Sequence, residues 1–539
     1  MLRQAPRGLA MGEASGFRRL LYRTPIYRWT ISPRRPVDVA TPLAALWPGD
    51  AARGRALVDG ELLLGGRAFT LPDTGWAPAE APAGWRAQLD GFDWLADLRD
   101  LGGDFGRRRA RELVGRWLDR YQRWDPIAWQ PAATGRRIAS WLGHYGFFCA
   151  SADDDFRDRV LASLGTQARH LARVVGDAQP GSARLAAVKG MALAAVGLSG
   201  LDALLAPALA RLEAELSEQI LIDGGHASRS PSVHLAVLRD LIEIRQALRL
   251  ARIAPPLPLL QAIEAMSAML RYLRHGDGGL ALFNGSNEEP GSLIDAVIHQ
   301  SESRSRLAVG APDFGIERLY AGRTTIFIDC GHGQATDDRI HAGPLSFELS
   351  VGRERLIVNL GGAGFLPGEW SDAQRATAAH STLAIDDTNA IRLETGAPPP
   401  AIELKRDEAD GQVWLEASHD GYVDRLGASH RRRLYLSADG EDLRGEDLVT
   451  GAAGKPFQLR FHLHPRVQVS LAQNAAAALL RLPSGSGFRL RVSGGRLDLG
   501  EAVYLGRAGE MKRTQHVLVT GVLDGQTTLK WALRREGRR

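Results

Sequence analysis

Three histidines stand in short glycine-rich segments where a side chain could transfer a proton. His226 lies in the stretch DGGHASRSP, His275 in RHGDGG, and His341 in IHAGPLSFEL. Histidine titrates near neutrality without help from its surroundings, so it often serves as the general acid or base of an enzyme. We therefore take His226, His275 and His341 as candidate catalytic residues.

A second group of polar residues close to these segments could bind a substrate anion. Arginine presents a planar fork that holds a carboxylate or a sulfate through two hydrogen bonds, and asparagine offers an amide donor. Structural roles stay open as alternatives, because Asn284 precedes a glycine, which is a turn signal, and a helix C-terminus stabilises a nearby histidine. The candidates for substrate binding are Arg229, Asp277, Asn284, Asn359 and Arg375.

The composition is that of an ordinary globular protein. Of its 539 residues, 44% are hydrophobic and 24% are charged, and a chain of this length divides into two or more domains. The net charge of +5 comes mainly from arginine, which indicates either an acidic partner or a base-composition bias of the gene. No basic tract interleaved with aromatics suggests nucleic-acid binding, and two distant cysteines exclude a disulfide framework.

The sequence also bears on the location of the protein. It contains no run of about 18 apolar residues that would predict a transmembrane helix. Residues 1–30 lack the apolar core of a signal peptide, which indicates a cytoplasmic location. Residues 17–23 (FRRLLYR) are short, basic and amphipathic, which fits either a solvated first helix or contact with a membrane surface.

Hydrophobic periodicity predicts a helical first half. Leu205, Leu209, Leu212 and Leu216 recur at helical spacing, and Pro231 follows a serine, as at the start of a helix. Nine of the twelve tryptophans precede residue 142, where they could line a sugar-binding cleft or fill the core. Helices are predicted over residues 136–149, 156–175, 183–199, 205–220, 232–252 and 258–273, and a small hairpin over residues 57–70.

After about residue 315 the period changes from near four to two. Residues 324–329 are predicted to form a strand and residues 345–359 two strands around Gly352. Residues 457–464 alternate apolar and polar side chains, and this alternation, with glycine and aspartate at the turns, continues to the C-terminus. A run of helices followed by a run of strands indicates two separate layers or domains. The predicted organisation is an N-terminal extension over 1–75, a helical domain over 76–315 and an antiparallel sheet domain over 316–539.

Several stretches resemble proteins of the heparinase II/III family. The most specific are IHAGPLSFEL at residues 340–349, LIVNLG at 356–361 and RATAAHSTL at 375–383, in the family's order and spacing. The helical segments FDWLADL, DGGHASRSP and RHGDGG resemble the family's first half, so the likeness covers nearly the whole chain. The resemblance implies an N-terminal (α/α) toroid followed by a C-terminal antiparallel β-sandwich, with a cleft between them.

Characterised members of that family are polysaccharide lyases that cleave uronic-acid glycans by β-elimination. The reaction requires a donor that neutralises the uronate carboxylate, a base that removes the C5 proton, and an acid for the leaving oxygen. The resemblance implies an acidic polysaccharide as the partner. The chain departs from the family at several positions, since Val233 stands where lyases often carry tyrosine, and Arg229 where they often carry glutamate.

The resemblance also raises the question of a structural zinc ion. In the family, histidines at the positions of His341 and His380 serve catalysis or bind zinc together with an aspartate. The aspartate position holds Asn359 here, and asparagine is a poor zinc ligand. We therefore expect His341 and His380 to lie close together, and zinc to bind weakly or not at all.

Three functions remain open from the sequence. The first is a polysaccharide lyase with a rearranged site, in which Tyr272, Tyr320 and Tyr422 are further candidate bases. The second is a non-catalytic, envelope-associated protein that binds glycans on the same scaffold. The third is a glycoside hydrolase, which the scarcity of acidic residues near the loops disfavours. An envelope location agrees with the family, whereas the start of the sequence indicates the cytoplasm.

Overall fold

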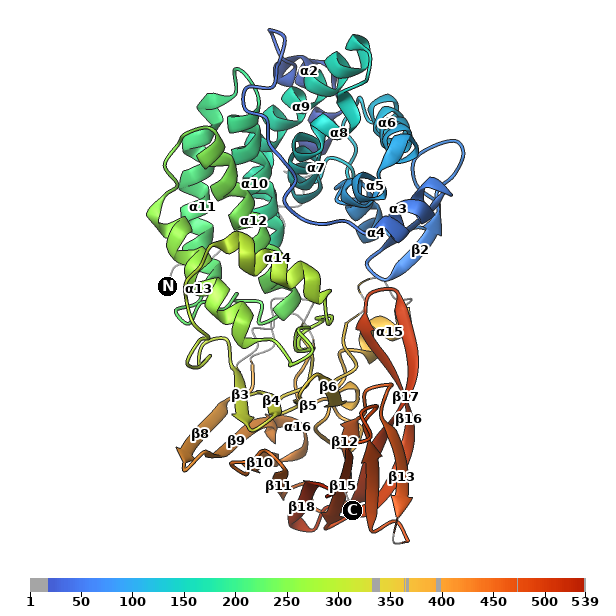
Figure 1. Ribbon diagram of the computed structural model, residues 1–539, viewed down its shortest axis with the longest axis vertical. Helices are drawn as coiled ribbons and strands as arrows, with labels where there is room; N and C mark the ends of the chain where they lie inside the picture. Colours follow the sequence, from blue (N-terminus) through green and yellow to red (C-terminus); the bar gives the residue numbers. More distant parts are fainter. Residues whose placement is uncertain are drawn as a thin grey trace, which may run out of the picture. The chain divides into compact units, whose positions relative to one another are not determined.

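The computed structural model describes residues 18–331, 340–362, 364, 368–393, 399–472 and 474–537 (Figure 1). The chain divides into two compact units. The helical unit comprises residues 1–64, 68–217 and 239–261, and the sandwich unit comprises residues 65–67, 218–238 and 262–539.

Helices form the first half of the described chain, as the periodicity predicts. They are α2 (Pro25–Ile31), α3 (Ala51–Val58), α4 (Ala83–Leu89), α5 (Leu95–Leu101), α6 (Gly103–Arg120), α7 (Pro131–Gly143), α8 (Tyr145–Cys149), α9 (Asp154–Val174), α10 (Ser182–Gly197), α11 (Leu205–Gln219), α12 (Pro231–Leu250), α13 (Leu257–Tyr272) and α14 (Gly291–Ser301). Five of the six predicted helices are confirmed, whereas the one predicted over residues 136–149 is divided between α7 and α8. Pro231 is the first residue of α12. The predicted hairpin is shorter than expected, because α3 occupies its first residues and the strands are β1 (Glu61–Leu64) and β2 (Arg67–Thr70).

Helices α7 and α10 approach each other closely within the helical unit. A Cβ atom on Gly190 would lie 2.3 Å from the Cα atom of Gly135, and a Cβ atom on Gly135 would lie 2.3 Å from the carbonyl oxygen of Ala186. Only residues without a side chain fit at such a crossing. The two glycines therefore fix the distance between these helices.

The early tryptophans are mostly part of the core of this unit. Trp85, Trp117 and Trp141 are almost completely buried, and the Arg137 guanidinium lies 4.0 Å from the ring centroid of Trp117. Of the two roles open to these rings, the structure assigns these three to packing. Trp29 is an exception, because 72% of its surface is exposed.

Antiparallel sheets form the second half, coloured from yellow-green to red in Figure 1. One sheet has the order β3-β4-β5-β6, a second has β16-β17-β12-β7, and a third has β13-β14-β15-β18-β11-β10-β9-β8. The strands are β3 (Ile316–Ala321), β4 (Thr324–Asp329), β5 (Phe347–Val351), β6 (Glu354–Ile357), β7 (Leu383–Ile385), β8 (Ile402–Ala409), β9 (Gln412–Tyr422), β10 (Ala428–Leu436), β11 (Asp442–Gly451), β12 (Pro456–His462), β13 (Gln468–Ala472), β14 (Ala477–Arg481), β15 (Gly487–Ser493), β16 (Arg496–Arg507), β17 (Glu510–Val522) and β18 (Gly525–Arg535). Two short helices, α15 (Gly368–Ala373) and α16 (Val423–Leu426), interrupt the strands.

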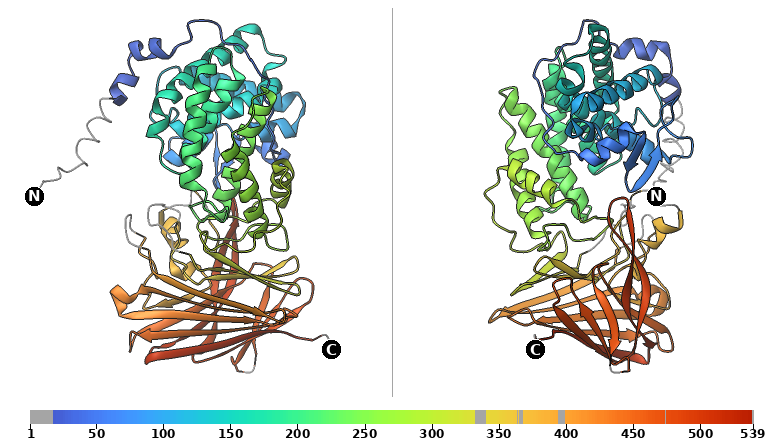
Figure 2. Two further views of the ribbon diagram at one scale, coloured as in Figure 1. Left: turned by 90° about the vertical axis from the view of Figure 1, so that its left-hand side faces the viewer. Right: turned by 45° about the vertical axis from the view of Figure 1, so that its right-hand side comes forward.

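All three sheets contribute side chains to one hydrophobic core. Buried residues alternate with exposed ones along β9 and β10, so each strand turns one face to this core and the other to solvent. The predicted fold class, a helical toroid followed by an antiparallel β-sandwich, is confirmed, and Figure 2 shows the two kinds of structure from further sides. Helix gives way to strand between α14 and β3, whereas the two compact units divide within α11, α12 and α13, so the predicted domain boundaries stay a prediction.

A charged network lies inside that core. The Asp447 carboxylate accepts hydrogen bonds from His430 Nε2 at 2.8 Å, from Arg432 Nε at 2.8 Å and from Trp531 Nε1 at 2.9 Å. The side chains of His430, Arg432 and Asp447 are completely buried. Burial opposes ionisation of Asp447, but Arg432 and His430 outweigh it and hold the pKa of this carboxyl well below its usual range.

Among the described residues, no helix is both long enough and apolar enough to cross a lipid bilayer.

Candidate functional site

His341 and His380 form a hydrogen-bonded pair in the sandwich unit. The Nδ1 atom of His341 lies 3.0 Å from Nε2 of His380, and both rings are buried. The other nitrogen of His380, Nδ1, lies 2.8 Å from the carbonyl oxygen of Ala376. The predicted proximity of the two histidines is thus confirmed.

These contacts fix the positions of the ring protons. A carbonyl oxygen can only accept, so Nδ1 of His380 carries the proton and Nε2 carries a lone pair in the neutral ring. Nδ1 of His341 must then donate to His380, which leaves Nε2 of His341 unprotonated. Burial lowers the pKa of His380 to about 4, and burial, His380 and Arg375 together hold the pKa of His341 well below its ordinary value. Both rings are therefore neutral at physiological pH.

The free nitrogen of His341 faces a glycine turn. A Cβ atom on Gly285 would lie 3.7 Å from Nε2 of His341, and within the described part of the chain Nε2 has no hydrogen-bonding partner. Gly285 itself packs on Gly362, since a Cβ atom on Gly362 would meet the carbonyl carbon of Gly285 at 2.4 Å. The turn therefore leaves space in front of the His341 lone pair.

Asn284 joins two of the predicted segments to this pair. Its Nδ2 donates to the backbone oxygen of Arg229 at 3.0 Å, and its Oδ1 accepts from the backbone N–H of His341 at 3.3 Å. The loops 223–231 and 274–285 and the strand segment around His341 all belong to the sandwich unit. Asn284 therefore orients the candidate base, and a role for its amide in substrate binding stays a prediction.

Arg229 lies in a buried ion pair. Its guanidinium contacts the Asp329 carboxylate, and its Nε donates to the backbone oxygen of Phe314 at 2.8 Å. Both charged side chains are about 6% exposed. The fork that we expected to hold a substrate carboxylate thus holds a carboxylate of the protein, and a role for Arg229 in substrate binding stays a prediction.

His226 and His275 use their ring nitrogens within the fold. His226 contacts Ser228 Oγ through Nδ1 at 2.8 Å and Gln219 Oε1 through Nε2 at 3.0 Å. His275 contacts Ser350 Oγ through Nδ1 at 2.8 Å and Glu348 Oε2 through Nε2 at 3.0 Å. Burial and then Arg355 lower the pKa of His275 despite this carboxylate. Catalytic roles for both stay predictions, and each would require one of these bonds to break.

Asp277 and Asn359 are likewise engaged by neighbouring groups. Asp277 pairs with the buried Arg355 through contacts of 2.8 and 3.2 Å. The amide of Asn359 accepts from the backbone N–H of Ser381 at 3.0 Å and donates to the backbone oxygen of Leu282 at 3.4 Å. Neither contact leaves an obvious site for a substrate anion, so substrate binding by these two residues also stays a prediction.

The donors around the histidine pair do not suit zinc. Zinc in proteins takes three or four ligands from histidine, cysteine and carboxylate side chains. The third position here is the Asn359 amide, whose oxygen is bound to the Ser381 N–H. In the described segments, no three His, Cys, Asp or Glu side chains gather in a way that could hold a metal ion. We therefore derive no chemical step through a metal at His341 and His380.

Arg375 supplies positive charge beside the pair. Its Nε donates to the backbone oxygen of Ile340 at 3.1 Å, its backbone oxygen accepts from Ala342, and its side chain is half-buried. The charge of Arg375 contributes to the low pKa of His341. A cation next to a neutral base is the combination that removal of a proton beside a carboxylate requires.

Sequence reasoning missed Glu348. This fully buried carboxylate accepts from His275, from the backbone N–H of Leu282 at 2.9 Å and from the backbone N–H of Asn359 at 2.9 Å. The signal was a lone acid in the apolar run LSFEL, because a buried carboxylate must find donors. Glu348 ties the 274–285 loop to β5 and β6.

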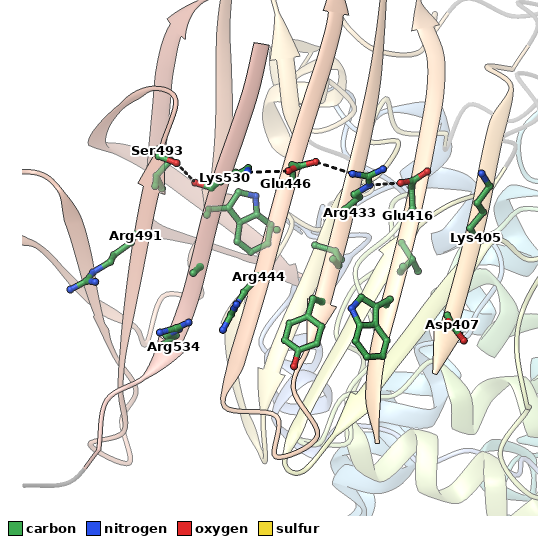
Figure 3. Close-up of a pocket in the computed structure, with 18 of the residues that line it drawn as sticks. Lys405, Asp407, Glu416, Arg433, Arg444, Glu446, Arg491, Ser493, Lys530 and Arg534 are labelled. Carbon is green, nitrogen blue, oxygen red and sulfur yellow. Dashed lines mark hydrogen bonds and ion pairs between the residues drawn. The ribbon is translucent and has the colours of Figure 1, made fainter. Parts of the chain in front are cut away.

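A hollow lies elsewhere, on the outer face of the eight-stranded sheet. It measures about 790 Å³, and none of the candidate residues from the sequence lines it. Strand register places Arg491, Ala532, Arg444, Tyr435 and Trp414 in one row across five neighbouring strands (Figure 3). A parallel row of charges, from Lys530 through Glu446, Arg433 and Glu416, flanks it (Figure 3). We call this surface the arginine–aromatic face.

Comparison with known proteins identifies the family. A sequence profile of the heparinase II/III N-terminus matches residues 85–301, and one of the heparinase II/III-like C-terminal region matches residues 303–532. The chain belongs to the heparinase II/III family. Its toroid and sandwich are the architecture of that family's lyases.

Individual relatives add detail to this assignment. "FtsZ-localized protein C" of Caulobacter vibrioides (strain NA1000 / CB15N) is 30% identical over 513 residues, covering 90% of this chain and 88% of the relative. A crystal structure of heparinase III aligns with a TM-score of 0.73 at 14% identity, covering 95% of this chain and 88% of that one. Chondroitin AC lyase of Streptomyces coelicolor A3 aligns with a TM-score of 0.54 at 12% identity, covering 91% of this chain and 79% of that one. At these identities the two structures show a shared fold.

Proposed function

We propose that this protein cleaves a uronic-acid polysaccharide by β-elimination, with His341 as the base that removes the C5 proton. The observation that carries the proposal is the hydrogen-bonded series from the Ala376 carbonyl through His380 to His341. It presents an unprotonated Nε2 towards the Gly285 turn. The heparinase fold and lyase relatives support an acidic polysaccharide as the substrate class.

The chemistry divides among a few residues. Arg375 binds the uronate carboxylate and makes the C5 proton more acidic, because it stabilises the charge that develops on the carboxylate. Nε2 of His341 accepts that proton, the bond between C4 and its glycosidic oxygen breaks as the C4–C5 double bond forms, and the departing oxygen takes up a proton from water. His380 acts as a positioning residue that holds the tautomer of His341.

The depressed pKa of His341 has a direct consequence for this reaction. A base with a low pKa stays unprotonated over the whole neutral range, so its lone pair is available at the pH of a cell. Turnover should therefore be flat from neutral pH downward, until the ring begins to protonate in the acid range. An ordinary exposed histidine would instead lose activity below pH ~6.5.

A screen of uronate polymers tests the proposal. Heparan, hyaluronan, alginate and bacterial uronate polymers are incubated with the protein, and the ultraviolet absorbance of the unsaturated product is recorded. We expect His341→Gln to reduce kcat by at least about 100-fold, the usual contribution of a general base. Turnover by His275→Gln distinguishes the two histidines. If His275→Gln lost all turnover and His341→Gln lost none, the assignment of His341 as the base would be refuted.

A second function, binding of an acidic glycan without cleavage, is supported by the arginine–aromatic face. Seven cationic residues and three acidic ones line its hollow. The rings of Trp414 and Tyr435 lie 5.3 Å apart, and the Arg444 guanidinium lies 5.6 Å from the Tyr435 ring centroid. An aromatic ring covers the apolar face of a pyranose, and a guanidinium holds its carboxylate or sulfate.

The spacing on this face fits an extended chain of sugars. Arg491 and Arg444 are separated by two strand spacings, about 10 Å, which is of the order of one disaccharide repeat. A relative is named for its localisation with FtsZ, and a scaffold that binds without cleaving suits such a name. Trp414→Ala should weaken glycan binding about tenfold without changing turnover, whereas His341→Gln should leave binding at this face intact.

A further inference from the structure

The first described residues present large apolar side chains to solvent. Leu20 is 66% exposed, Leu21 42%, Ile26 73% and Trp29 72%. They lie on two helical segments, residues 18–22 and α2. Both segments lie at the outside of the helical unit (Figure 2). We call these four side chains and the arginines around them the N-terminal surface.

Specific contacts fasten the other side of this segment to α9. Tyr27 hydroxyl and His170 Nδ1 lie 2.7 Å apart, and Arg173 donates to the Thr30 backbone oxygen at 3.0 Å. Tyr27 and Ile31, spaced by four residues, are both buried. Ile26 and Trp29, spaced by three residues, therefore share the opposite, outward side of α2. Their exposure follows from how the helix is attached.

The charge around these side chains has one sign. Residues 18–37 contain six arginines and no acidic residue. Arg18 is paired with Asp177 at 3.2 Å, and both groups are about half exposed. Arg19, Arg23 and Arg28 are also exposed beside the apolar side chains. An apolar strip bordered by arginine, with a tryptophan within it, is the composition of segments that lie at the interface of an anionic bilayer.

We propose that the N-terminal surface binds the headgroup region of a membrane that contains anionic phospholipid. Trp29 and Ile26 insert among the acyl chains near the headgroups, and the arginines contact the lipid phosphates. The inference is independent of the catalytic proposal. Both apolar insertion and charge are needed, because neither a few buried side chains nor a few cations alone give firm attachment.

Co-sedimentation of the full-length protein with vesicles tests this proposal. We expect binding to vesicles of equimolar phosphatidylcholine and phosphatidylglycerol, and none to vesicles of pure phosphatidylcholine. Binding should weaken as salt rises, since charge contributes to it. The double variant Ile26→Ser/Trp29→Ser should lose at least about tenfold in affinity, and Arg19→Gln/Arg28→Gln a comparable amount.

A matched control distinguishes binding by the N-terminal surface from nonspecific adsorption through any exposed apolar side chain. Phe105 on α6 is 70% exposed, so Phe105→Ser removes a comparable apolar side chain elsewhere on the helical unit and should bind vesicles like wild type. Equal losses in both variants, or unchanged binding by Ile26→Ser/Trp29→Ser with a wild-type unfolding temperature, would overturn the proposal. So would a protein that binds no vesicles and dimerises through these side chains, which equilibrium sedimentation of the same variant would reveal.

Discussion

Replacing Asp447 by asparagine tests how the sandwich core is held together. The carboxylate accepts from His430, Arg432 and Trp531, and the Arg432 side chain has no exposed surface. Asparagine keeps one oxygen for these three donors and turns an N–H towards them. The change therefore leaves a buried guanidinium without a counter-charge.

The expected loss of stability in Asp447→Asn follows from this geometry. Breaking a buried ion pair by removing one partner typically costs about 3–5 kcal/mol, against a total stability of about 5–15 kcal/mol. A domain of about 150–250 residues shifts its unfolding temperature by about 2–4 °C for each kcal/mol of lost stability. We therefore expect the unfolding temperature of the sandwich unit to fall by roughly 6–20 °C. Differential scanning calorimetry at pH 7 measures it.

Glu416→Gln provides the control. Glu416 pairs with Arg433 on the outer face of the same sheet, where the two side chains are 26% and 49% exposed. An exposed pair contributes less than about 1 kcal/mol, so this variant should unfold close to wild type. If Asp447→Asn unfolds within 2 °C of Glu416→Gln, roughly the effect of one kcal/mol, the reasoning about the buried network is wrong.

Three further predictions concern stability and the site. Burial lowers the pKa of several histidines to about 4 in the folded protein, whereas the same side chains protonate at pH ~6.5 in the unfolded chain. Acid therefore favours the unfolded chain, and the free energy of unfolding, measured in urea, should fall continuously as the pH drops from ~6.5 to ~4. These histidines are His144, His170, His234, His380 and His516; a stability that is constant over this range would contradict their burial as neutral rings. Arg229→Gln leaves the Asp329 carboxylate buried and unpaired, so thermal unfolding should show a loss of about 3 kcal/mol, and a neutral effect would mean that this pair is not formed. Gly362→Ala should displace the Gly285 turn and reduce turnover more than it reduces the unfolding temperature, which parallel kinetic and calorimetric assays would check.

Much of the fold could be predicted from local patterns. The period of the apolar side chains located α11 and α12 and the strands around Gly352, because periodicity depends only on neighbours along the chain. The start of the hairpin was misplaced because Leu57 and Val58 fit the end of a helix as well as a strand. The compact units could not be predicted, since they depend on contacts between distant segments.

The site was less accessible to sequence reasoning, for a related reason. Motif similarity brought His341 and His380 together correctly. Arg229 had the chemistry of an anion clamp, but its partner Asp329 lies 100 residues further along, and no local signal connects the two. Glu348 was visible as an acid in an apolar run, yet its three donors come from different segments. Residue type showed what each group could do, and only the fold showed which groups were already occupied.

Chemical rescue of His341→Ala tests the proposed role of His341 most directly. The alanine variant leaves space where the ring stood, and added imidazole can enter it as a substitute base. On the uronate polymer that the wild type cleaves best, we expect the variant to be inactive alone. Unsaturated product should then appear in proportion to the concentration of neutral imidazole. Full activity of His341→Ala without imidazole, or a wild type that forms no unsaturated product from any uronate polymer, would contradict the proposed function.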